Sequence, residues 1–240
     1  WLEDAEDFLW KVRLQLHAIQ GKKRDKLVLS AQEEIANRLG FGGESMDAVS
    51  PVEGFMRNYY KHSARIRRVT DFVLEKLSTY LQPANSRPGK NHIIAGDFVV
   101  QGSHIRFYLP SRIKHDPGLL MHIFWYAAKY KVHFHHETGQ IIRENLHRFT
   151  PELGRKDTIV SEFFDILQDP QMAFHILKTM LETGFLEVFL PEFAPIRYKV
   201  QYDVYHLYTV DEHLLRTVRE LHVLEQENLK DDSSYSYLNT

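Results

Sequence analysis

Residues 50–83 read SPVEGFMRNYYKHSARIRRVTDFVLEKLSTYLQP. The stretch opens with the signals that start a helix: Ser50 as the N-cap, Pro51 at the first helical position and Glu53 as a carboxylate in the first turn. Apolar residues then recur at helical spacing until Pro83 stops the pattern. The stripe consists of Val52, Met56, Tyr59, Ser63, Ile66, Val73, Leu77 and Tyr80. This pattern predicts one long amphipathic helix.

Helical patterns continue on both sides of this stretch. Upstream, apolar residues from Phe8 to Ile19 have helical spacing and Gly21 can end that helix. Ser30 and Glu33 resemble a capping box, which predicts a second helix from there to Leu39, with Gly40 past its end. Downstream, helices are predicted from Asp116-Pro117, near 137–147, near 157–167, from Asp169-Pro170 to Gly184, and from the Thr209–Glu212 capping box to about Leu229.

One short β element interrupts the helices. The apolar runs at 97–100 and 105–108 flank a Gln101-Gly102-Ser103 turn, which is the pattern of a hairpin. The predicted fold class is therefore all-α, a multi-helix bundle with one small β-hairpin. Six phenylalanines are assigned to core packing: Phe163, Phe164, Phe174, Phe185, Phe189 and Phe193.

The composition excludes several classes of function. Lys plus Arg number 30 against 32 Asp plus Glu, for a formal net charge of −2, which argues against a general nucleic-acid binder. Cysteine is absent, so there is no disulfide framework or thiolate metal site, as in a cytoplasmic protein. No apolar run approaches the length of a membrane span, so no membrane partner is expected.

Several short motifs, taken together and in order, carry a family resemblance. They are WKVR at 10–13, Leu16-His17, QEEIA at 32–36, Leu39-Gly40, VEGFMRNYY at 52–60, Met180, Gly184, Leu186, LPEF at 190–193 and YHLYTVDEH at 205–213. At this spacing they resemble the helical middle of bacterial PII uridylyltransferase/uridylyl-removing enzymes. In that family this region follows the nucleotidyltransferase core and leads into the HD domain.

The resemblance implies a division into residues 1–200, a helical domain after a missing nucleotidyltransferase core, and 201–240, the truncated start of an HD domain. The parent enzyme of this nitrogen-regulation family transfers UMP from UTP to the PII signalling protein. Its HD hydrolase domain removes UMP with a divalent metal such as Mg²⁺ or Mn²⁺. His213 falls where the first metal-binding histidine of the HD domain would lie.

The resemblance also implies that this stretch lacks a complete active site. No His-Asp pair follows His213, so the remaining metal ligands of an HD hydrolase are missing. The chain starts at Trp1 without a Met and ends in a polar stretch at Thr240, and it is expected to be an excised segment. The predicted role is an interdomain scaffold, inactive alone and without a cofactor of its own.

Three functional alternatives stay open at this point. The chain could be a helical regulatory or partner-binding module, or the similar helical domain of glutamine synthetase adenylyltransferase. It could also be an HD-type phosphohydrolase, although the missing His-Asp pair argues against this. From its neighbours Asp211 and Glu212 alone, His213 is either a metal ligand or a partly buried histidine on a capped helix.

Other clusters also allow two interpretations. Arg57, Lys61, Arg65 and Arg68 form a basic stripe that could face UTP phosphates or PII, or be a solvated helix face. Three histidines, His133, His135 and His136, stand beside Glu137 and could bind a transition metal or form an exposed strand end. Residues 42–47 imitate a nucleotidyltransferase turn, but position 49 is Val49 where a second Asp is needed, so a connecting loop is predicted.

Overall fold

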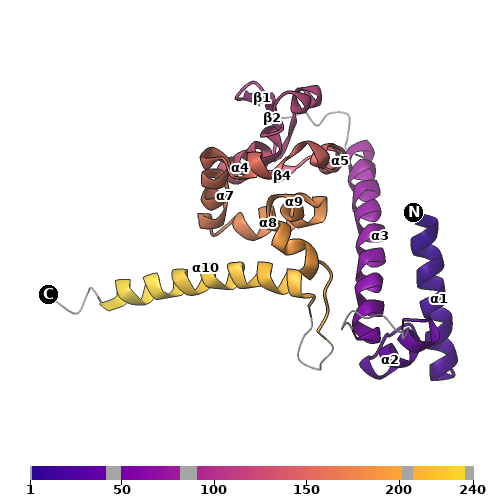
Figure 1. Cartoon of the computed structure of the whole chain (residues 1–240). Helices are drawn as coiled ribbons and strands as arrows, with labels where there is room; N and C mark the ends of the chain where they lie inside the picture. The colour runs from indigo at the N-terminus through magenta and orange to yellow at the C-terminus, as the bar shows by residue number, and fades with distance from the viewer. Residues whose placement is uncertain (1, 42–49, 82–90, 202–207, 236–240) are drawn as a thin grey trace. The chain divides into compact units, whose positions relative to one another are not determined.

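The structure, a computed structural model, describes residues 2–41, 50–81, 91–201 and 208–235 and is mostly helical with a small sheet (Figure 1). This confirms the predicted fold class. The chain forms two compact units. Unit 1 comprises Trp1–Leu81 and Pro195–Asp211, and unit 2 comprises Gln82–Ala194 and Glu212–Thr240. The division near residue 200 was predicted from the family resemblance, and it remains a prediction.

Unit 1 consists of three helices and the returning segment 195–211. The helices are α1 (Leu2–Gln20), α2 (Leu29–Arg38) and α3 (Pro51–Leu81). Gly21 has φ +63° directly after α1, which is the left-handed conformation that ends a helix. α3 begins at Pro51, as predicted, and Gly54 N–H donates to the Ser50 carbonyl at 3.0 Å.

The core of unit 1 lies between α1, α2 and the first turns of α3. Its buried residues are Val12, Leu16, Ala31, Ile35, Ala36, Val52, Phe55 and Met56. The later part of the predicted α3 stripe is not buried, since Val73 is 45% exposed and Leu77 is 49% exposed. α3 therefore packs at one end and carries apolar side chains to the surface at the other.

The capping box predicted at Ser30 is wrong. α2 begins one residue earlier, at Leu29, and the residue before it, Val28, makes no side-chain cap. Ser30 therefore lies inside the first turn, where it has no capping role.

The hairpin of unit 2 belongs to a four-stranded sheet in the order β1-β2-β3-β4. The strands are β1 (Asn91–Ile94), β2 (Phe98–Gln101), β3 (His104–Phe107) and β4 (His133–Phe134). β2 and β3 form the predicted antiparallel hairpin, and Gly102 takes φ +58°, which a two-residue hairpin turn needs at its first central position. β1 pairs antiparallel with β2 and was not predicted. β4 pairs parallel with β3 and was anticipated only as the strand end at the histidine cluster.

Helices cover this sheet and complete the core of unit 2. They are η1 (Pro110–Lys114), α4 (Leu119–Tyr130), α5 (His136–Asn145), η2 (Leu146–Arg148), α6 (Pro151–Gly154), α7 (Asp157–Gln168), α8 (Ala173–Thr183), α9 (Phe185–Phe189) and η3 (Pro191–Ile196). The last helix is α10 (Val210–Tyr235). Phe124 and Phe185 lie fully buried at the centre with ring centroids 5.1 Å apart.

The assignment of six phenylalanines to the core is wrong for one of them. Phe164 is 55% exposed on α7, whereas Phe185 is buried and the other four pack against the core. Among the described residues, no helix is both long enough and apolar enough to cross a bilayer.

Candidate functional site

His213 lies on the first turn of α10 with its side chain exposed. The helix starts at Val210, directly after Thr209, where the sequence predicted its beginning. The His213 carbonyl accepts a hydrogen bond from the Thr217 hydroxyl at 3.1 Å, an ordinary contact within the helix. The nearest further candidate metal ligands in the sequence are the two carboxylates beside His213, Asp211 and Glu212.

Asp211 is a buried structural anchor. Its side chain is 2% exposed, and its Oδ2 accepts the Tyr198 backbone N–H at 3.0 Å and Arg197 Nη1 at 3.5 Å. Arg197 also donates through Nη2 to the Tyr198 hydroxyl at 2.9 Å. Tyr198 has φ +54°, a conformation that non-glycine residues adopt rarely and that the contact with Asp211 holds in place.

The segment before α10 is also held from α3. Arg57 donates from Nε to the Arg197 carbonyl at 3.1 Å and from Nη2 to the Pro195 carbonyl at 3.4 Å. The Val210 N–H donates to the Lys199 carbonyl at 2.8 Å. Arg57 therefore has a definite structural role that its place in a basic stripe did not reveal. Arg197 and Tyr198 were missed by the sequence, because no local spacing joins them to Arg57, 140 positions earlier.

Glu212, the second carboxylate beside His213, is paired within α10. Arg216, one turn further along α10, donates from Nε to Glu212 Oε1 at 3.1 Å, and its Nη2 lies 3.0 Å from the same oxygen. Both carboxylates beside His213 thus contact arginines. An i,i+4 ion pair on a helix stabilises it by only about 0.3–0.5 kcal/mol.

The residues around His213 do not fit a complete divalent-metal centre. Within ranges 2–41, 50–81, 91–201 and 208–235, no three His, Asp or Glu side chains gather as a ligand set. His206, which precedes His213 by seven positions, lies outside the described residues. A hydrolytic zinc or manganese site takes three or more protein ligands, and no catalytic step can be derived from His213 alone.

The three histidines after α4 are close in sequence but do not form one cluster in the fold. His133 lies on β4 and contacts His175 of α8, with His133 Nδ1 and His175 Nε2 3.1 Å apart. His135 caps the start of α5, its N–H donating to the Ile105 carbonyl at 2.9 Å, and the side chain of His136 lies outside the description. His175, 42 residues from His133, was not predicted, because only the packing of α8 brings the two together.

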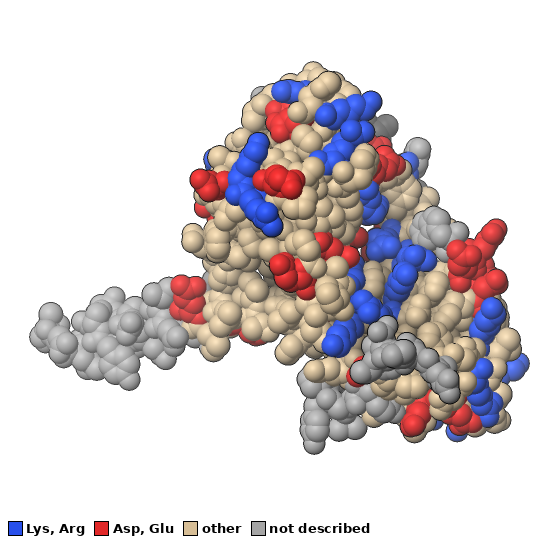
Figure 2. All heavy atoms as spheres, in the orientation of Figure 1, with Lys and Arg blue, Asp and Glu red and all other residues tan. Residues whose placement is uncertain are grey.

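The basic stripe on α3 lies in a segment without acids. From Gly54 to Thr70 the helix has no Asp or Glu, and basic side chains gather over α3 (Figure 2). Burial lowers the pKa of His62, and so do the charges of Arg65 and Lys61. The stripe thus has a positive potential, while its ligand, nucleotide or PII, stays a prediction. The predicted loop at 42–47 lies outside the described residues.

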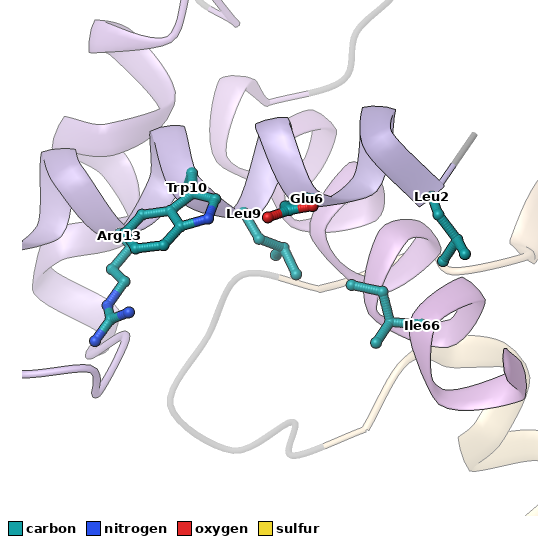
Figure 3. A pocket seen from close by; sticks show the side chains of 6 residues that line it. All are labelled: Leu2, Glu6, Leu9, Trp10, Arg13 and Ile66. Atoms are coloured by element: carbon teal, nitrogen blue, oxygen red, sulfur yellow. The ribbon is translucent and has the colours of Figure 1, made fainter. Parts of the chain in front are cut away.

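A groove of about 500 Å³ opens between α1 and α3 (Figure 3). It is lined by Leu2, Glu6, Leu9, Trp10, Arg13 and Ile66. Arg13 stacks over Trp10 at 5.2 Å and donates through Nε and Nη2 to the two carboxylate oxygens of Asp25 at 2.9 Å each. The hydrogen bond from His17, followed by that from Arg13, holds the pKa of Asp25 below its ordinary value. The groove was not predicted, since its two walls are far apart in sequence.

Two family models match the chain in succession. The model described as GlnD PII-uridylyltransferase matches residues 1–74, and the one described as uridylyltransferase GlnD third domain matches residues 98–189. Two curated relatives are each a bifunctional uridylyltransferase/uridylyl-removing enzyme, one from Rhodopseudomonas palustris and one from a Bradyrhizobium species. Each is 32% identical to this chain over an alignment of 236 positions, and the alignment covers 92% of this chain and 25% of the relative. No solved structure matches the chain.

The chain belongs to the PII-uridylyltransferase family, as its sequence motifs indicated. It spans a quarter of the length of the curated relatives that it matches.

Proposed function

We propose that this chain is the interdomain scaffold of a bifunctional enzyme that transfers UMP from UTP to PII and removes it by hydrolysis. The observation that carries this proposal is the agreement between the family matches and the compact units. The first model falls within unit 1 and the second within unit 2, in that order along the chain. A chance match would not respect both the boundaries and the order of independently packed units.

The anchored start of α10 supports the scaffold role. Asp211 accepts the Tyr198 N–H, and Arg57 donates to the carbonyls of Pro195 and Arg197, so the segment that leads into α10 is held by contacts within unit 1. On this proposal residues 201–240 begin the HD domain, and His213 is its first metal ligand in the complete enzyme. His213 is exposed on the first turn of α10, where a metal ion could reach it.

The remaining parts of the proposal concern the complete enzyme. Its substrates are UTP and PII, its metal is Mg²⁺ or Mn²⁺, and its location is the cytoplasm. A hydrolytic site would use the metal to activate water for attack on the phosphodiester. This chain alone is proposed to have neither activity, because its described residues supply no converging set of metal ligands.

The first experiment incubates the purified chain with PII, UTP and Mg²⁺, and separately with uridylylated PII and Mn²⁺. The mass of PII is followed by mass spectrometry, with the full-length enzyme as positive control. No gain or loss of UMP above buffer is expected with the chain. Turnover that is abolished by substituting a single residue of this chain would overturn the scaffold proposal.

The second experiment places His213→Ala in the full-length enzyme. Removal of UMP should fall at least about a hundredfold, as expected when a metal ligand is lost, while UMP transfer to PII is retained. Arg216→Ala, one turn further along α10, is the matched control and should leave both activities near the wild-type level. Unchanged UMP removal by His213→Ala would refute the metal assignment without affecting the family membership.

A further inference from the structure

His133 and His175 present two imidazole nitrogens to each other at the surface of unit 2. His133 Nδ1 and His175 Nε2 are 3.1 Å apart, and the ring centroids lie 4.8 Å apart at 89°. His133 is exposed and His175 is half-buried, so the pair is open to solvent on one side. The simplest function of the contact is a hydrogen bond in which one ring donates and the other accepts.

The same separation suits two ligands of one metal ion. Histidine nitrogens bind Zn²⁺ at about 2.0–2.1 Å, which puts two ligand nitrogens about 2.9 Å apart at a right angle and about 3.3 Å apart at the tetrahedral angle. The observed 3.1 Å lies between these values. For both to bind one ion, the rings must turn about their Cβ–Cγ bonds, a soft torsion, until both lone pairs point at one position.

The two rings are held on rigid elements. β4 is fixed to β3 by the His133 N–H donating to the Ser103 carbonyl at 2.8 Å. The turn before α8 is fixed by Asp169, whose Oδ1 accepts the N–H groups of Gln171 and Met172 at 2.9 Å each. Lys131, two residues before His133, also donates to Gln171 at 2.6 Å, so the chain before β4 contacts the turn before α8. A metal ion would therefore meet a nearly formed pair and lose little side-chain freedom on binding.

The chemistry of the two ligands selects the metal. A neutral imidazole is the form that binds a metal. Nitrogen ligands select borderline transition metals, whereas Mg²⁺ prefers oxygen ligands.

We propose that His133 and His175 form a two-histidine site for Zn²⁺, Ni²⁺ or Cu²⁺ that joins the sheet of unit 2 to α8. Water fills the remaining coordination positions, because no third His, Asp or Glu within the described ranges completes a ligand set. A further imidazole, His104, faces His133 across the β3–β4 pair with a ring centroid 6.2 Å away. The site is separate from His213 and does not depend on the proposed enzymatic function.

The experiment is calorimetric titration of tag-free chain with NiCl₂, ZnCl₂ and MgCl₂, together with thermal unfolding in each salt. Ni²⁺ and Zn²⁺ should bind and raise the unfolding temperature, and Mg²⁺ should do neither. His133→Asn and His175→Asn should each weaken Ni²⁺ binding at least about tenfold, because loss of even an outer-shell partner of a metal costs about 10- to 100-fold in affinity.

His147→Asn is the matched control, since His147 is an exposed histidine of η2 in the same unit. It should leave Ni²⁺ binding unchanged. Circular dichroism of each variant establishes that unit 2 remains folded, and the superhyperfine splitting of bound Cu²⁺ in electron paramagnetic resonance should show two nitrogen ligands that are reduced to one in His175→Asn. Absence of Ni²⁺ binding by the wild type, or equal binding by all three variants, would overturn the proposal.

Discussion

Unit 1 and unit 2 bury their apolar residues in different ways. Unit 1 packs three helices around a short core at one end, and both α1 and α3 carry apolar side chains to the surface, among them Leu14 at 61% and Leu74 at 58% exposure. Unit 2 encloses α4 between the sheet and further helices, so that Leu120, Ile123 and Phe124 are 0% exposed.

The difference predicts that the two units differ in their free energy of unfolding. Stability rises with the apolar area removed from water, at roughly 25 cal/mol per Å². The free energy gained by burying a small core exceeds the cost of the conformational entropy lost on folding by little. A larger core leaves a larger net stability. Unit 1 is therefore expected to unfold first.

The largest expected effect comes from removing one buried ring in each unit. Phe55→Ala and Phe124→Ala should each cost about 3–5 kcal/mol, because both rings are fully buried. That loss should unfold unit 1 near room temperature but only lower the midpoint of unit 2. Trp10 and Trp125 report on unit 1 and unit 2, so fluorescence-monitored urea unfolding of Trp1→Phe/Trp10→Phe and Trp125→Phe backgrounds separates the two.

A single transition with the same midpoint in both backgrounds would contradict this comparison. It would show that the units unfold together as one cooperative body.

The next largest effect distinguishes two adjacent carboxylates on α10. Asp211→Ala should destabilise unit 1 by about 1–3 kcal/mol, because it removes a buried carboxylate that accepts the Tyr198 N–H. Glu212→Ala is the matched control and should cost less than about 0.5 kcal/mol, the usual size of an i,i+4 pair such as the one with Arg216. Urea unfolding measures both, and equal losses would show that Asp211 is not an anchor.

A smaller effect should appear in the pH dependence of unit 2. Burial alone would lower the pKa of His122, but the hydrogen bond from its Nδ1 to Glu162 at 2.7 Å and the nearby carboxylates outweigh burial, so the pKa is raised above 6.5. The folded state then binds a proton more tightly than the unfolded state. The contribution of His122 to stability is complete below pH 6.5 and is lost as the pH rises through its raised pKa.

His175 should show the opposite dependence. Its pKa is lowered from 6.5 by burial first and by His133 and Lys178 next, so its contribution is present above pH 6.5 and is lost as the pH falls through the lowered pKa. Thermal unfolding of His122→Asn and His175→Asn in metal-free buffer, from pH 5 to 8, should change the slope of stability against pH in opposite directions. Changes of the same sign would refute one of the two shifts.

The smallest expected effect is at His213. His213→Ala should change the free energy of unfolding of this chain by less than about 1 kcal/mol, because the side chain is exposed and the helix contact uses its carbonyl. Chemical denaturation measures the change. A larger loss that added Mn²⁺ relieves in the wild type but not in the variant would reveal a native metal site at His213.

The sequence by itself determined the elements whose signals lie within a few residues. Ser50 and Pro51 start α3, Gly21 ends α1, and Gly102 forms the hairpin turn, each through the conformation of one residue or a contact within one turn. It also determined the family, because ordered motifs preserve their spacing when the rest of the chain has diverged. The error at Ser30 concerned the cap, because α2 begins at Leu29 after Val28, which makes no side-chain cap.

Only the tertiary structure decided the partners of these elements. The short strand β4 exists because β3 supplies its hydrogen bonds, and His133 finds His175 because α8 packs beside it. Likewise Asp211 holds Tyr198 and Arg57 holds the segment before α10 through contacts that no sequence period encodes. The physical reason is range: capping and periodicity act over three or four residues, whereas burial joins whichever distant side chains the packed helices bring together.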